Sequence, residues 1–232
     1  MTKMNNAHGP AAILFDFGGT LDADGVAWKD RFRRLWCEEV GEIAPEQFDP
    51  VFYAVDDALV GAIPATLSFH DTVEKIARGV SQKMGRPDDV VGARIAKRFV
   101  EESLERLRGN ALVLCDLSRR YRLGIVSNFY GNLSAVCREV GLSPFLSVII
   151  DSTVVGVLKP NPEIFHAALR VFQIEPAQAV FVGDSLQRDM AGARAVGMAH
   201  VWLTPKPFHD GEACCPNDPV AHGLEEVRAL FA

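Results

Sequence analysis

Polar side chains that could perform chemistry follow apolar segments at separate places along the chain. Buried strands are predicted at three apolar runs, 11–15, 122–126 and 179–182, and the residues at or just past their ends are Asp16, Ser127 and Asp184. Parallel strands bring their carboxyl ends to one sheet edge, so we expect these side chains to converge, with Lys159 joining from a loop. A carboxylate, a hydroxyl and an ammonium group around one cavity suit phosphoryl transfer, because a cation must separate an anionic nucleophile from an anionic phosphate.

Taken singly, each of these residues also suits a purely structural role. Ser127 or Asn128 could cap a helix, and Lys159 before Pro160 could be a solvated loop lysine. Asp184 and Asp189 could be surface acids at a helix start, where the helix dipole favours them. The case for chemistry therefore depends on all of them occurring together.

Four segments resemble, in order, the motifs of the haloacid dehalogenase-like (HAD) hydrolase superfamily. The segment from Asp16 to Leu21 has the form Asp-x-x-Gly-Thr-Leu, and the run 123–128 ends on Ser127 and Asn128. A lysine, Lys159, opens the third segment, 159–165. Gly183-Asp184-Ser185 followed by Asp189 completes the fourth. Each pattern is weak alone, and their order and spacing across the chain make the match specific.

The resemblance implies an α/β fold: a Rossmann-like doubly wound parallel sheet with an inserted α-helical cap domain. Residues 1–21 and 109–232 would form the core and residues 22–108 the cap. Helical periodicity agrees with this from Val26 to about Arg108, where apolar residues recur on one face at Trp28, Phe32, Leu35 and Trp36. The last cap helix is expected to run from Pro87 towards Leu107.

After Gly109 the pattern alternates between strands and helices, as in a parallel sheet covered on both faces. Helices are expected over 111–120, 132–140, 163–172, 190–196 and 218–231. Strands are expected over 122–126, 146–150, 179–182 and, as the last strand, 200–203, with a loop over 205–219.

The resemblance also implies roles for the motif residues in hydrolysis of a small phosphate ester. Asp16 would be the nucleophile and form an aspartyl phosphate, with Lys159 as the second catalytic residue. Phosphate oxygens would be bound by Thr20, Ser127 and Asn128. Mg²⁺ would be the cofactor, held by Asp16, Asp184 and the carbonyl oxygen of Gly18, with Asp189 orienting Lys159 or the metal shell.

The chain departs from the family's usual pattern at Gly18. Most phosphatases of the family have a second aspartate there, which protonates the leaving group and later activates water. General acid–base catalysis contributes roughly 10²–10⁴-fold, so its loss would slow poor leaving groups. Asp22 or Asp24 could replace it by reaching into the site, although both also suit a polar turn. Alternatively, water and the substrate could supply the proton.

Other functions stay open because of this departure. Haloacid dehalogenases also lack the second aspartate, but their fourth motif differs from Gly183-Asp184-Ser185. Phosphonate-cleaving relatives use a cap lysine, for which the candidates are Lys29, Lys75, Lys83 and Lys97. A catalytically weak binding or regulatory protein is the third possibility.

The composition of the chain restricts the kinds of partner that the protein is expected to bind. The net charge of −6 argues against nucleic acid as the main partner, and no apolar run approaches the length of a membrane helix. Residues 1–10 lack a signal-peptide core. The five cysteines, which include the pair Cys214-Cys215, follow no disulfide or zinc-site pattern. We therefore expect a reducing, cytoplasmic setting. The sequence does not indicate an oligomeric state. Cap residues that could contact substrate are His70, Arg31, Arg33 and Arg34, although each also suits an ordinary solvated helix face.

Overall fold

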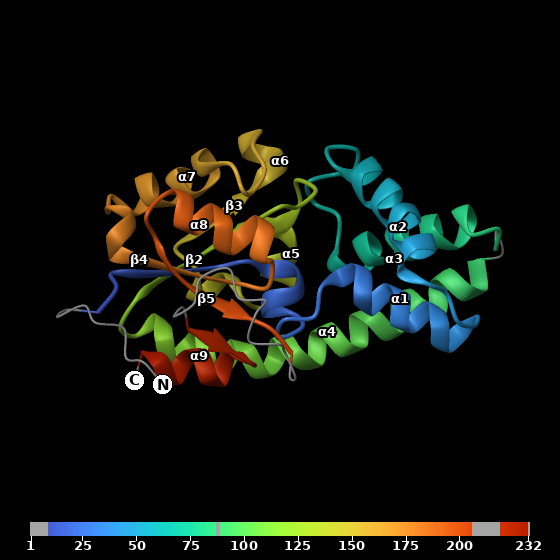
Figure 1. Ribbon diagram of the computed structural model, residues 1–232, viewed down its shortest axis with the longest axis horizontal. Helices are drawn as coiled ribbons and strands as arrows, with labels where there is room; N and C mark the ends of the chain where they lie inside the picture. The colour runs from blue at the N-terminus through green and yellow to red at the C-terminus, as the bar shows by residue number, and fades with distance from the viewer. Residues whose placement is uncertain (1–8, 87–88, 206–218, 232) are drawn as a thin grey trace.

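A six-stranded parallel sheet forms the centre of the protein in a computed structural model, which describes residues 9–86, 89–205 and 219–231. The strands are β1 (Ala12–Phe15), β2 (Arg122–Ser127), β3 (Val148–Asp151), β4 (Ala179–Gly183), β5 (Ala199–Leu203) and β6 (Val220–Ala221), in the order β3-β2-β1-β4-β5-β6. Figure 1 shows helices on both sides of this sheet. The predicted doubly wound α/β fold is therefore confirmed.

Side chains of β1 alternate between two hydrophobic cores, one on each face of the sheet. Ile13 and Phe15 join a core that includes residues of α4 (Asp89–Ser118), α5 (Leu133–Glu139) and α9 (Leu224–Leu230). Ala12 and Leu14 face the other core, built with α7 (Pro162–Phe172) and α8 (Ala191–Ala195). All four side chains of β1 are fully buried, which explains why the strand is a continuous apolar run.

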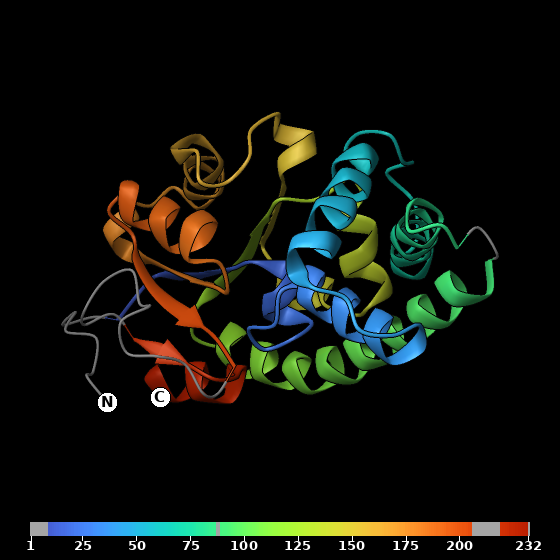
Figure 2. The same cartoon turned by 45° about the vertical axis from the view of Figure 1, so that its right-hand side comes forward.

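Helices are the only regular elements among the described residues from Trp28 to Arg108, which we call the helical insertion. They are α1 (Trp28–Glu39), α2 (Pro45–Leu59), α3 (Phe69–Lys83) and the first part of α4. Ser68 caps α3 by accepting a hydrogen bond from the Asp71 amide. In Figure 2 these helices group together beside the end of the sheet.

One long helix, α4, joins the insertion to the core (Figure 1). The sequence predicted a break at Gly109, and this prediction is wrong, because Asp89–Ser118 is a single helix of 30 residues. A Cβ at Gly109 would have nothing within 4 Å, so the glycine lies on an open helix surface and does not end the helix. The predicted limit between residues 108 and 109 lies inside this helix.

The strand β6 was missed by the sequence prediction, which made 200–203 the last strand and 218–231 one helix. Val220 and Ala221 pair in parallel with Trp202 and Leu203, and α9 begins only at Leu224. A strand of two residues is too short to give a periodic pattern. Asp218, Cys214 and Cys215 lie outside the described residues, as do residues 1–8 and most of the expected loop. Within the described part, no helix is long and apolar enough to cross a membrane.

Candidate active site

Asp16 lies directly after β1, and its backbone amide donates a hydrogen bond of 2.9 Å to the Val182 carbonyl of β4. The chain then turns sharply over Phe17–Leu21, where Gly19 has a positive φ of 88°. A Cβ at Gly19 would lie 2.6 Å from Oδ2 of Asp184. Glycine at this position therefore lets the turn after Asp16 approach the carboxylate that follows β4.

Lys159 links two carboxylates in the buried site. Its Nζ lies 2.7 Å from Oδ1 of Asp16 and 2.6 Å from Oδ1 of Asp189. Burial lowers the pKa of Lys159, but the two carboxylates more than offset this and raise it above its ordinary value. The lysine is thus held as a cation beside Asp16.

Asn128 holds the backbone of Lys159 through both ends of its side-chain amide. Its Nδ2 donates to the Lys159 carbonyl at 3.1 Å, and its Oδ1 accepts from the Lys159 amide at 2.7 Å. The predicted contact of Asn128 with substrate stays a prediction, and the geometry adds a positioning role. Ser127, at the end of β2, lines the cavity described below, whereas Thr20 directs its hydroxyl to Oδ1 of Asp184 at 3.2 Å.

Three carboxylates meet at this edge of the sheet. Oxygen atoms of Asp16, Asp184 and Asp189 lie within 4.8 Å of one another. Asp189 also accepts a hydrogen bond of 3.0 Å from the Ser185 amide, so its two oxygens contact Lys159 and the backbone. A Cβ at Gly183 would come within 2.4 Å of Asp189, which explains the glycine before Asp184.

The electrostatics of these carboxylates suit a divalent cation. Burial, together with Asp189 and Asp16, raises the pKa of Asp184 well above its ordinary value. Burial also raises the pKa of Asp189 to about 6, although Lys159 opposes the shift. Lys159 supplies one positive charge in contact with this cluster. When all three acids are ionised, their mutual repulsion is therefore only partly offset, and a hard oxygen-binding cation such as Mg²⁺ would relieve the rest.

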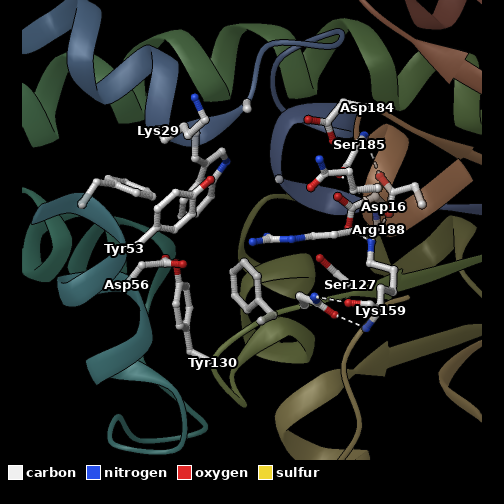
Figure 3. A pocket seen from close by; sticks show the side chains of 18 residues that line it. Asp16, Lys29, Tyr53, Asp56, Ser127, Tyr130, Lys159, Asp184, Ser185 and Arg188 are labelled. Atoms are coloured by element: carbon white, nitrogen blue, oxygen red, sulfur yellow. Dashed lines mark hydrogen bonds and ion pairs between the residues drawn. The ribbon is translucent and has the colours of Figure 1, made fainter. Parts of the chain in front are cut away.

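A cavity of about 320 Å³ opens beside Asp16, between the core and the helical insertion (Figure 3). Asp16, Gly18, Ser127, Asn128, Lys159, Asp184 and Asp189 line its core side. The sequence analysis missed most of the other lining residues, which include Trp28, Lys29, Phe52, Tyr53, Asp56, Tyr130 and Arg188. The only sequence signal for the α2 residues is their helical spacing, since Phe52 and Tyr53 each precede Asp56 by about one turn.

Trp28 occupies the space next to Gly18 where the usual second aspartate would project. A Cβ at Gly18 would lie 3.1 Å from the indole Nε1. The indole packs edge-on against Phe69, Phe99 and Phe129, and its N–H donates to Oδ2 of Asp22 at 2.8 Å. Gly18 and Trp28 are therefore complementary in shape.

Asp22 and Asp24 do not replace the missing acid, so this prediction is wrong. Asp22 is 1% exposed and accepts hydrogen bonds from Trp28, Arg31 and Ser103, which hold it beneath the indole. Asp24 pairs with Arg106 at 2.9 Å. Neither aspartate is among the described residues that line the cavity beside Asp16.

The predicted cap contacts also lie elsewhere. Arg31 is buried in its ion pair with Asp22, Arg34 pairs with Glu38 and Glu102, and His70 is exposed. None of these, nor Arg33, belongs to the described lining of the cavity. Arg31 and Arg34 face α4 and the α1 surface, which agrees with the structural role that the sequence left open for these residues.

One of the four lysines considered for phosphonate cleavage, Lys29, does line the cavity. Burial lowers the pKa of Lys29, but hydrogen bonds and ion pairs with Asp30 and Asp49 more than offset this and raise it. A raised pKa keeps the amine protonated and opposes nucleophilic attack. The other three candidates, Lys75, Lys83 and Lys97, are not among the described lining residues.

Comparison with known proteins agrees with this geometry. A family model described as haloacid dehalogenase-like hydrolase matches residues 10–197. The chain is 45% identical over 113 residues to haloacid dehalogenase-like hydrolase domain-containing protein 3 of Bos taurus, covering 49% of this chain and 45% of that protein. It is 38% identical over 93 residues to glyceraldehyde 3-phosphate phosphatase of Methanopyrus kandleri, covering 40% of each. The matches span about half the length of such relatives, or less.

Solved structures share the fold at low sequence identity. The HAD-hydrolase YfnB from Bacillus subtilis, bound to magnesium, is 21% identical with a TM-score of 0.62, covering 96% of this chain and 99% of that one. L-2-haloacid dehalogenase from Xanthobacter autotrophicus is 18% identical with a TM-score of 0.61, covering 96% and 98%. With the family model matching most of the chain and the motif residues gathered at one sheet edge, the protein belongs to the haloacid dehalogenase-like hydrolases.

Proposed function

We propose that this hydrolase is a Mg²⁺-dependent phosphatase of a small phosphate ester, with Asp16 as the nucleophile. The observation that carries the proposal is the buried contact of Lys159 with both Asp16 and Asp189, beside Asp184. The relative named as glyceraldehyde 3-phosphate phosphatase supports a phosphate substrate. The helical insertion would act as the cap that closes over this substrate, because α1 and α2 supply one wall of the cavity.

In the proposed reaction the Asp16 carboxylate attacks phosphorus, forming an acyl phosphate as the bond from phosphorus to the leaving oxygen breaks. Lys159 offsets the charge of Asp16 and of the phosphoryl group, and Ser127 donates a hydrogen bond to a phosphoryl oxygen. Water then attacks phosphorus, releases inorganic phosphate and restores the carboxylate. Asp189 and Asn128 hold Lys159 in place through its Nζ and its backbone.

Mg²⁺, held by Asp16, Asp184 and the carbonyl oxygen of Gly18, would supply further positive charge to the phosphoryl group during transfer. The carboxylate of Asp189 is engaged by Lys159 and the Ser185 amide, which favours its orienting role over direct ligation. Because Gly18 carries no acid, the leaving alkoxide takes its proton from water. The site should therefore prefer esters of acidic alcohols, whose oxyanions need no acid.

A screen of phosphomonoesters with and without Mg²⁺, including an aryl phosphate with a good leaving group, tests this function. We expect phosphate release that requires Mg²⁺ and disappears in Asp16→Asn. Metal-independent halide release from 2-haloacids would instead support dehalogenase chemistry. Retained ligand binding without turnover of any substrate would support a regulatory role. The cytoplasmic location stays a prediction.

A further inference from the structure

The wall of the cavity opposite Asp16 holds a carboxylate that the proposed reaction does not use. Asp56, on α2, lines the cavity together with Tyr130, which follows β2 (Figure 3). The Tyr130 hydroxyl donates a hydrogen bond to Oδ1 of Asp56. Two segments 74 positions apart in the chain thus meet at this carboxylate.

Asp56 lies in a setting that is costly for a charge. Burial raises its pKa, and the nearby carboxylate of Asp57 raises it further, while Tyr130 and Arg188 lower it. No salt bridge between described residues includes Asp56. A carboxylate accepts at two oxygens, and the tyrosine satisfies one of them, so the group can still accept hydrogen bonds from a bound molecule.

Tyr130 fixes the direction in which Asp56 points. Its ring packs against Phe129 with ring centroids 4.9 Å apart, and against Trp28 at 6.5 Å. Since Trp28 also fills the space beside Gly18, the tyrosine is supported by the same aromatic group that shapes the nucleophile side. The acceptor is therefore held in place before any ligand arrives.

Arg188 restricts which chemical group of a ligand could bind beside Asp56. In Figure 3 its side chain reaches across the cavity, between Asp16 and the wall formed by Asp56 and Tyr130. A carboxylate only accepts hydrogen bonds and a guanidinium only donates them. A hydroxyl group does both, whereas an ammonium group would be repelled by Arg188 and a carboxylate by Asp56.

We propose that Asp56, oriented by Tyr130, binds a hydroxyl group at the end of the substrate remote from the phosphoryl group. The protein would then act on short hydroxylated phosphate esters in preference to esters with an apolar or anionic tail. This inference rests on the proposed phosphatase function and adds the class of substrate to it. The cavity of about 320 Å³ suits a molecule of this size.

A matched series of three-carbon phosphate esters tests the inference. The series is propyl phosphate and its analogues with a terminal hydroxyl, ammonium or carboxylate group, so only the remote end differs. For the wild-type protein we expect kcat/KM for the hydroxyl ester to exceed that for propyl phosphate by about tenfold or more, the scale of one hydrogen bond to a charged group. The ammonium and carboxylate esters should both fall below the hydroxyl ester.

Asp56→Asn should reduce the hydroxyl-to-propyl ratio to about threefold or less, because the neutral amide is a weaker acceptor. Tyr130→Phe should reduce the hydroxyl-to-propyl ratio by a smaller amount, because the Asp56 carboxylate loses the donor that orients it. This reduction should appear as a higher KM for the hydroxyl ester. The control is Asp57→Asn, the same change at the next residue of α2, which is exposed and does not line the cavity. Its ratio should not fall below the wild-type value, because losing the Asp57 charge only favours the ionised form of Asp56.

The outcomes separate this inference from the function on which it rests. Mg²⁺-dependent hydrolysis with a hydroxyl-to-propyl ratio near one, or a ratio that Asp56→Asn leaves unchanged, overturns the inference alone. A preference for the ammonium ester that depends on Asp56 overturns the hydroxyl assignment. Failure to hydrolyse any ester, the aryl phosphate included, overturns the phosphatase function and this inference with it.

Discussion

At the scale of single residues, the pair Gly18 and Trp28 explains why this site lacks the usual second aspartate. A Cβ at position 18 would lie only 3.1 Å from the indole Nε1, and the indole is held by Asp22 and by surrounding aromatic rings. Restoring the acid therefore requires more than one substitution. A side chain forced into a packed site typically costs about 1–3 kcal/mol.

We expect Gly18→Asp to destabilise the protein without accelerating hydrolysis of alkyl phosphates, because the new side chain meets Trp28. Gly18→Asp combined with Trp28→Phe should be more stable than the sum of the two single changes predicts, by about 1 kcal/mol, within the usual range for residues in contact. Urea unfolding of the four proteins measures this coupling. Additive free energies would show that Trp28 does not obstruct position 18.

Asn128 should act by positioning Lys159. Asn128→Ala removes both hydrogen bonds to the Lys159 backbone, so we expect kcat for an aryl phosphate to fall about tenfold or more with little change in KM. Ser127→Ala serves as the comparison and should raise KM, because Ser127 is proposed to bind the phosphoryl group. A rise in KM alone for Asn128→Ala would instead support the direct substrate contact predicted from the sequence.

At the scale of elements, α4 connects the insertion to the core as one helix, with an exposed glycine in its interior. Glycine costs roughly 0.5–1 kcal/mol relative to alanine inside a helix, and α4 carries this cost at Gly109. The sequence analysis placed the change of pattern at Gly109 and expected a new helix from residue 111. Packing of α4 against α1, α3 and the sheet overrides the local propensity.

Gly109→Ala should therefore stabilise the protein by roughly 0.5–1 kcal/mol in urea unfolding. Gly141→Ala is the matched control, since a Cβ there also has nothing within 4 Å, but the φ of Gly141 is +78°. Alanine is strained in that conformation, so this control should destabilise the protein. Equal effects of the two substitutions would contradict a helical Gly109.

At the scale of the whole molecule, the local motifs could be predicted from the sequence, whereas the contacts between core and insertion could not. Asp16 and Asp184 are predictable because each directly follows an apolar strand of the same sheet. Asp56 meets Tyr130, and Trp28 meets Gly18, only after the insertion folds against the core. Such contacts depend on packing between segments distant in the chain and leave no periodic pattern.

The carboxylate cluster should make stability depend on pH and on Mg²⁺. The raised pKa values of Asp184 and Asp189 mean that the folded state binds protons more readily than the unfolded state. In EDTA, the free energy of unfolding should therefore fall as the pH rises from about 4 through about 6 and beyond, because both groups lose their protons. Asp184→Asn removes one charge. It should be more stable than the wild type in EDTA near pH 7.5, with an advantage that shrinks as the pH falls towards 4.

Mg²⁺ should reverse this order near pH 7.5, because a cation that binds only the folded state stabilises the protein that can hold it. Melting temperatures of both proteins, with EDTA and with Mg²⁺, measure the effect. An Asp184→Asn variant that gains as much from Mg²⁺ as the wild type would exclude Asp184 as a ligand.

Chemical trapping at Asp16 tests the central claim most directly. Rapid quenching during turnover of an aryl phosphate with Mg²⁺, followed by borohydride, reduces an acyl phosphate on aspartate to homoserine, which peptide mass spectrometry locates. We expect homoserine at position 16 when both Mg²⁺ and the ester are present, and aspartate there when either is left out. Phosphate release with position 16 unmodified throughout turnover would contradict nucleophilic attack by Asp16.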